Sequence, residues 1–103
     1  MKQVVFKMKL KPGCEVEYRK RHDNIWPELV TLLKQNGIKN YNIFFDKETD
    51  TLIAVQYIDE GITASLHENP LMMKWWEHMA DLMEVNPDQS PVVVGLENVF
   101  SMP

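Results

Sequence analysis

The chain has little cysteine, glycine or positive charge, and each shortage argues against a class of function. Cys14 is the only cysteine in 103 residues, which excludes an intrachain disulfide and a cysteine-based zinc site and is typical of a reducing, cytosolic compartment. The four scattered glycines form no glycine-rich phosphate loop. The net charge of −4 argues against a nucleic acid partner, because phosphate binding needs clustered Lys and Arg.

Long hydrophobic runs are also missing. No segment approaches the roughly 20 apolar residues that cross a bilayer. The first residues alternate with Lys7, Lys9 and Lys11, so we expect no signal region, no membrane contact and a cytoplasmic protein. A chain of 103 residues with 45% hydrophobic content predicts a single domain, residues 1–103. Such a short chain buries only about two-thirds of its unfolded surface, so association with a second copy would help it enclose a ligand.

Hydrophobic periodicity predicts the order β-α-β-β-α-β. The expected strands are 4–10, 40–45, 52–58 and then 92–94 and 98–100, and the expected helical segments are 15–22, 29–33 and 70–83. Pro27 predicts a break between the first two helical segments, because proline is tolerated only in the first turn of a helix. This order is that of the α+β, ferredoxin-like class, with one four-stranded antiparallel sheet.

The strands of the central hairpin have apolar side chains on both faces. Tyr41, Ile43 and Phe45 alternate with Phe44, so Phe44 is expected on the opposite face. One face would be covered by the helices. The other face carries apolar residues that water would not cover, which favours a homodimer packed sheet against sheet.

Tyr18 and His22 are the first candidates for chemistry. Positions four apart on a helix lie on the same face, so the phenol and the imidazole would form a proton-handling pair. A histidine on a helix is more often a surface or packing residue. The helix break at Pro27 and the supply of aromatic residues for a pocket wall favour the functional interpretation.

Aromatic residues supply the candidate ligand contacts. Trp75 and Trp76 are adjacent, so on a helix their side chains diverge by about 100° and one could pack in the core while the other lies against a sugar ring. Core packing of both is equally compatible with the pattern. Tyr41 could offer a hydroxyl to a ligand or be a buried structural residue. Trp26, before Pro27, is expected to pack rather than to bind.

Other constellations point to no chemistry. The histidines His22, His67 and His78 lack close metal-ligand spacing, so no metal is expected. No serine lies in a nucleophile elbow. The basic run 19–21 is flanked by acidic residues and is interpreted as a solvated helix face.

Several short motifs together resemble the L-rhamnose mutarotase family. They are YRKRH at 18–22, IWPEL at 25–29, NY at 40–41, WW at 75–76, NPD at 86–88 and SP at 90–91. The resemblance extends over nearly the whole chain, and the segment 59–69 departs most from the family pattern and looks shortened. It implies a dimeric α/β barrel of ferredoxin-like halves that interconverts the α and β anomers of L-rhamnose without a cofactor. It also implies His22 as the proton donor and Tyr18, Tyr41, Trp75 and Trp76 as sugar contacts.

The chemistry of anomer exchange agrees with this set of residues. Opening the ring requires a proton on the ring oxygen and the loss of another from the anomeric hydroxyl. The working hypothesis is that His22, as imidazolium, protonates the ring oxygen while Tyr18, Tyr41 or a water handles the anomeric hydroxyl. The second proton carrier, the tryptophan that faces the sugar and the tolerance for other deoxy sugars stay open. The alternatives are a haem-binding or cofactor-free monooxygenase of the same architecture and a non-catalytic sugar-binding module.

Overall fold

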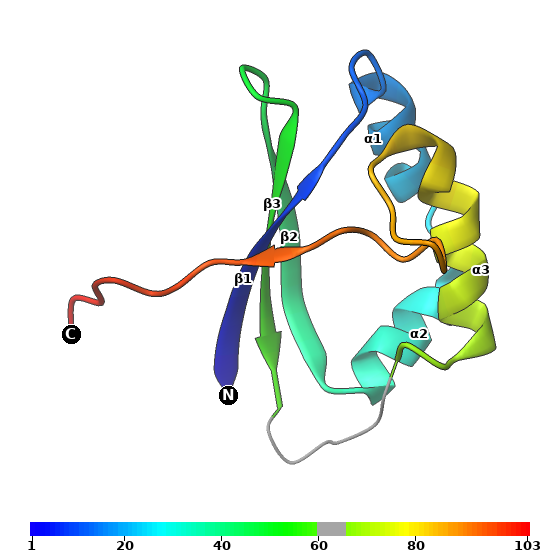
Figure 1. Cartoon of the computed structure of the whole chain (residues 1–103). Coiled ribbons are helices and arrows are strands. Elements are labelled where there is room, and N and C mark those ends of the chain that lie inside the picture. The colour runs from blue at the N-terminus through cyan, green and yellow to red at the C-terminus, as the bar shows by residue number, and fades with distance from the viewer. Residues whose placement is uncertain (60–65) are drawn as a thin grey trace.

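The computed structural model describes residues 1–59 and 66–103, and shows one sheet with all helices on one of its faces (Figure 1). Most of the segment that looks shortened in sequence therefore lies outside the described residues. The elements in chain order are β1 (Lys2–Lys9), α1 (Glu15–Asp23), α2 (Pro27–Gln35), β2 (Ile38–Asp46), β3 (Thr51–Ile58), α3 (Pro70–Met79), the short 3-10 helix η1 (Ala80–Leu82) and β4 (Val94–Gly95).

The sheet has four strands in the order β2-β3-β1-β4, and every neighbouring pair is antiparallel. This arrangement confirms the predicted ferredoxin-like class. No helix in the described parts of the chain is long and apolar enough to cross a membrane.

The predicted bounds of the last helix and the last strands are wrong. The helix ends at Met79 and tightens into η1, and the carbonyl of Leu82 then accepts a hydrogen bond from the Lys11 amide at 2.9 Å. Residues 98–100 pair with no strand, and Val99 is 93% exposed, because the tail leaves the sheet on the side away from the helices (Figure 1). Only Val94 and Gly95 form the last strand.

Pro27 separates α1 from α2, as its position predicts. It occupies the first turn of α2, and Trp26 before it is extended, with φ −64° and ψ 128°. At the end of α1, the side-chain amide of Asn24 donates to the carbonyl of Lys20 at 2.9 Å. The helix ends at Asp23, one residue after His22, so His22 lies in the last turn of α1.

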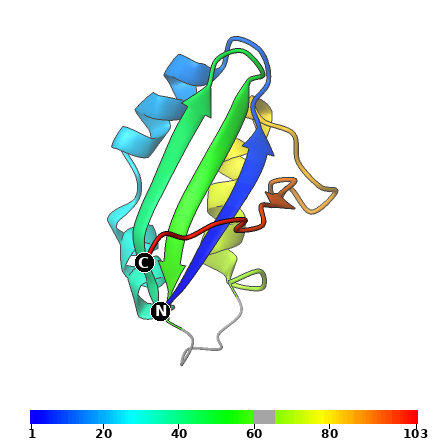
Figure 2. The ribbon, with the colours of Figure 1, turned by 90° about the vertical axis from the view of Figure 1, so that its left-hand side faces the viewer.

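The strand register gives the two faces of the sheet. Phe45 is paired with Leu52 and Ile43 with Ala54, so these side chains point to the helices, whereas Phe44 points away from them. This confirms the predicted alternation. The outer face, seen in Figure 2, carries none of the helices of the described residues.

A β-bulge interrupts β2 at the start of the hairpin. The register shifts between Lys39 and Asn42, with one more residue on β2 than on β3. The left-handed φ of 49° at Asn40 lies within this bulge. Tyr41 follows it directly and lines the space between the sheet and the helices.

The hydrophobic core lies in that same space. Its most buried members come from the sheet and from α2, α3 and η1, and include Leu10, Leu29, Leu52, Ala54, Met79 and Leu82. Helix α3 begins cleanly, because the side chain of Asn69 accepts from the Leu71 amide at 2.9 Å and Pro70 fills the first turn. The site described next is bounded by this core.

Candidate active site

Helix α1 holds Tyr18 and His22 side by side. Their ring centroids are 4.3 Å apart with an interplanar angle of 30°, which confirms the same-face arrangement expected from their spacing. Tyr18 is buried and His22 is half-buried. The imidazole is therefore accessible from one side and supported on the other by the phenol ring.

A hydrogen bond orients the imidazole of His22. Its Nδ1 lies 3.1 Å from the backbone carbonyl of Tyr18, and since a carbonyl only accepts, Nδ1 carries the hydrogen and Nε2 is left to take or give a proton. Burial lowers the pKa of His22 below its ordinary value, and this hydrogen bond and the charge of Asp23 oppose the effect only in part. The neutral ring, with its lone pair on Nε2, therefore predominates at neutral pH.

A cavity of about 1230 Å³ lies between the helices and the inner face of the sheet. It is larger than the roughly 300–1,000 Å³ typical of small-molecule sites. Its lining includes every site residue predicted from the sequence: Tyr18, His22, Tyr41, Trp75 and Trp76. These residues come from α1, β2 and α3 and meet only in the folded chain.

The two phenols in the cavity keep their protons at neutral pH. Burial raises the pKa of Tyr18, and the nearby Tyr41 raises it further because two phenolates would repel each other. Burial of its hydroxyl raises the pKa of Tyr41 to about 12, although 37% of the surface of the whole residue is exposed. Both side chains can therefore donate a hydrogen bond from the hydroxyl at neutral pH.

The two tryptophans have different surroundings on the same helix. Trp75 is 6% exposed and presents its ring edge to His22, with centroids 5.4 Å apart. It also meets Trp26 edge-on at 5.1 Å, which agrees with the packing role expected for Trp26. Trp76 is half-buried and contacts His67 at 5.0 Å. Trp75 thus serves the core and the cavity together, and Trp76 offers the more accessible indole.

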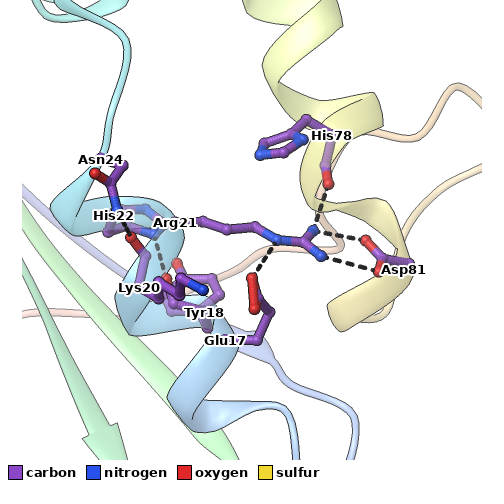
Figure 3. A network of polar contacts seen from close by, with 8 residues as sticks. All are labelled: Glu17, Tyr18, Lys20, Arg21, His22, Asn24, His78 and Asp81. Atoms are coloured by element: carbon purple, nitrogen blue, oxygen red, sulfur yellow. Dashed lines mark hydrogen bonds and ion pairs between the residues drawn. The ribbon is translucent and has the colours of Figure 1, made fainter.

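Arg21 is a residue that the sequence interpretation missed. Figure 3 shows its side chain crossing from α1 to the end of α3 instead of lying in solvent. The guanidinium binds both carboxylate oxygens of Asp81, at 2.8 and 3.2 Å, and donates to the backbone carbonyl of His78 at 2.6 Å. Its Nε donates to Glu17 at 3.1 Å. Asp81 is 60 positions away in the chain, so no local pattern could have indicated this contact.

The cavity combines proton carriers with flat apolar walls. It holds one imidazole with a free Nε2, two protonated phenols and two indoles. Within residues 1–59 and 66–103, no three His, Cys, Asp or Glu side chains gather as metal ligands would. The arrangement can therefore move protons on the hydroxyls of a small molecule that has an apolar face.

Comparisons with known proteins agree on one family. The sequence pattern of the L-rhamnose mutarotase family matches residues 3–102. The chain is 53% identical over 103 residues to an L-rhamnose mutarotase of Bacteroides thetaiotaomicron, covering 99% of each, and 57% identical over 99 residues to one of Rhizobium leguminosarum bv. trifolii, covering 95% of this chain and 93% of the relative. It is also similar to the crystal structure of L-rhamnose mutarotase from Formosa agariphila, with a TM-score of 0.92, 48% identity and full coverage of both chains. This chain belongs to the L-rhamnose mutarotase family.

Proposed function

We propose that this protein is an isomerase that interconverts the α and β anomers of L-rhamnose by acid/base ring opening and closure. Family membership supports the activity over the monooxygenase and over the non-catalytic sugar-binding module. The observation that carries the mechanism is the His22 ring, whose Nδ1 is held by the Tyr18 carbonyl while Nε2 is free beside the cavity.

The proton transfers follow from the protonation states in the cavity. Neutral His22 accepts the proton of the anomeric hydroxyl on Nε2, the bond from the anomeric carbon to the ring oxygen breaks, and the ring oxygen takes a proton from Tyr18, Tyr41 or a bound water. The freed aldehyde rotates, and closure on its other face reverses both transfers. The imidazolium of the working hypothesis is then the state that His22 reaches after ring opening.

The tryptophans would hold the sugar while it opens. An indole face suits the apolar C–H side and the methyl group of a 6-deoxy sugar and leaves its hydroxyls to polar groups. Trp76, the more exposed of the pair, would stack on the sugar, and Trp75 would support His22 from the core side. Each transfer needs only a positioned acid or base, so we propose that the reaction uses no cofactor.

Magnetisation transfer between the two anomeric protons of L-rhamnose tests the activity. Saturating one anomeric resonance should weaken the other faster with the protein than in buffer alone. Sugar binding without faster exchange would support the binding module and overturn the mutarotase. A visible absorption band formed on adding haem would support the monooxygenase instead.

We also propose that the working form is a homodimer packed through the outer face of the sheet. Phe44 is 60% exposed on that face, and Ile53 and Val55 lie beside it half-buried. The tail that leaves on the same side exposes 78% of Phe100 (Figure 1). Exposed apolar side chains that gather on one face are typical of an interface.

Sedimentation velocity tests this assembly. The wild type should sediment as a dimer and Phe44→Glu as a monomer, because a charge at the centre of the interface has no partner. Val16→Glu is the matched control, since Val16 is 78% exposed on α1, a helix on the other face of the sheet, and this variant should stay dimeric. A monomeric wild type would overturn the proposal.

A further inference from the structure

We propose that Arg21 is a positioning residue for His22, acting through the link from α1 to the end of α3. The inference builds on the proposed function, because it assigns a role to a side chain that is not part of the cavity lining. The link comprises Arg21, Glu17, Asp81 and the backbone carbonyl of His78 (Figure 3).

All three nitrogens of the guanidinium are engaged. Nη1 and Nη2 reach the two carboxylate oxygens of Asp81, the paired geometry that only arginine offers, and Nη1 also donates to the His78 carbonyl. Nε is bonded to Glu17 one turn back on α1. With only 19% of its side chain exposed, Arg21 is held in one conformation between two helices.

Helix α1 depends on this link because its own packing is sparse. Tyr18 is the only buried residue among Glu15–Asp23, and Val16 is 78% exposed. A helix with one buried side chain is held by few apolar contacts, so a polar connection close to His22 decides much of its position. Arg21 directly precedes His22 and connects its backbone to the helix that carries Trp75.

The link controls the distance between His22, the proposed base, and the cavity wall formed by α3. His22 lies on α1 and meets Trp75, on α3, at 5.4 Å between centroids. The carbonyl that Arg21 binds belongs to His78, one turn after Trp75. Releasing the guanidinium would let the last turn of α1 move relative to α3, and a shift of about 1 Å in a reacting group can slow turnover by about 100-fold.

Steady-state kinetics of anomer exchange provide the first test. Arg21→Gln should lower kcat by about 10- to 100-fold with little change in KM, at a temperature where circular dichroism shows the variant folded. Asp81→Asn should lower kcat less, since the His78 carbonyl and Glu17 still bind the guanidinium, and the double variant should be no worse than Arg21→Gln. Arg21→Lys should recover only part of the loss, because an ammonium cannot bind both oxygens at once.

Lys20→Gln is the matched control. It removes one positive charge from the neighbouring position on the same helix, where the side chain is exposed, and should leave kcat unchanged. An equal loss in Lys20→Gln would show a general charge effect and would overturn the proposal. Unchanged kcat in Arg21→Gln would overturn it too.

Proton NMR of the His22 ring separates this inference from the proposed function. The ring protons of His22 lie in the ring-current field of Tyr18 and Trp75, so their chemical shifts report its position without any substrate. Arg21→Gln and Asp81→Asn should shift these resonances, and Lys20→Gln should not. If the wild type failed to exchange anomers, the function would fail while the shifts still tested the link; unmoved His22 resonances in both variants would refute the link itself.

Discussion

Helices α1 and α3 form two walls of one cavity, and they are held in place in different ways. Helix α3 buries Met72, Trp75 and Met79 against the core, whereas α1 buries only Tyr18. Apolar packing fixes the wall that would carry the sugar. The wall that carries His22 is connected to α3 and η1 by the polar contacts of Arg21. Substitutions on α1 should therefore mainly affect turnover, and substitutions on α3 should mainly affect stability and binding.

The largest expected effect comes from removing the base. His22→Ala should lower kcat by about 10²- to 10⁴-fold, the range that a general acid or base contributes, while sugar binding and melting temperature change little. Magnetisation transfer and isothermal titration with L-rhamnose measure the two quantities. His78→Ala, which removes an imidazole outside the cavity lining, should retain turnover. Equal exchange rates in His22→Ala and wild type would remove the assignment.

The matching change on α3 should act on stability. Trp75→Ala should lower the free energy of unfolding by about 3–5 kcal/mol, because it empties a large buried volume. Urea denaturation measures this loss. Trp76→Ala on the same helix should lower stability less, since Trp76 is half-buried, and should weaken sugar binding more. A larger stability loss at Trp76 would contradict the division between core and ligand roles.

The two phenols of the cavity lie on different elements, Tyr18 on α1 and Tyr41 on β2, so variants of each test the contribution of one wall. Tyr18→Phe and Tyr41→Phe each remove one hydroxyl. Loss of a hydroxyl that only binds the sugar should lower kcat/KM by up to about tenfold, the worth of one hydrogen bond, whereas loss of the general acid should lower it by about 10²- to 10⁴-fold. Loss of the phenol that delivers the second proton should lower kcat, whereas loss of the other phenol should raise KM only. Equal wild-type kinetics in both variants would leave water as the second carrier.

The pH dependence of kcat/KM should be small near neutral pH, but its direction identifies the protonation state in which His22 starts the reaction. Because burial lowers the pKa of His22, the neutral ring should predominate at pH 7, and kcat/KM should fall as the pH drops through a value below 6.5. As the pH falls, the unfolded chain takes up this proton first, near pH 6.5. The contribution of His22 to the free energy of unfolding is therefore complete above this pH and declines below it. Activity that instead fell as the pH rose through this range would favour imidazolium as the starting form.

Local patterns in the sequence predicted most of the fold. The alternation of apolar residues predicted both faces of the hairpin, and Pro27 predicted the break between α1 and α2, because these features depend on neighbouring residues. The predicted helix 70–83 is four residues too long, because α3 ends at Met79. The Leu82 carbonyl accepts a hydrogen bond from the Lys11 amide, which belongs to a distant segment. Contacts between distant segments do not change the hydrophobic periodicity of the sequence.

Which aromatic residues line the cavity could be predicted from the sequence, but their geometry could not. The spacing of Tyr18 and His22 and the pair Trp75 and Trp76 indicated the participants. The direction of the pKa shift at His22 could not be inferred, because it depends on burial by segments that meet only in the fold. The contacts of Arg21 with Asp81 and with the His78 carbonyl could not be inferred for the same reason.

The bulge in β2 has a consequence for how this chain could be altered. Asn40 lies between Lys39 and Asn42, where β2 has one residue more than β3, and holds a left-handed φ of 49° next to Tyr41. Deleting it would restore a continuous ladder without reversing either face, so the shortened protein should gain thermal tolerance while the phenol of Tyr41, still on the inner face, changes its position in the cavity. Selection for heat resistance and selection for turnover would then pull in opposite directions at this one position.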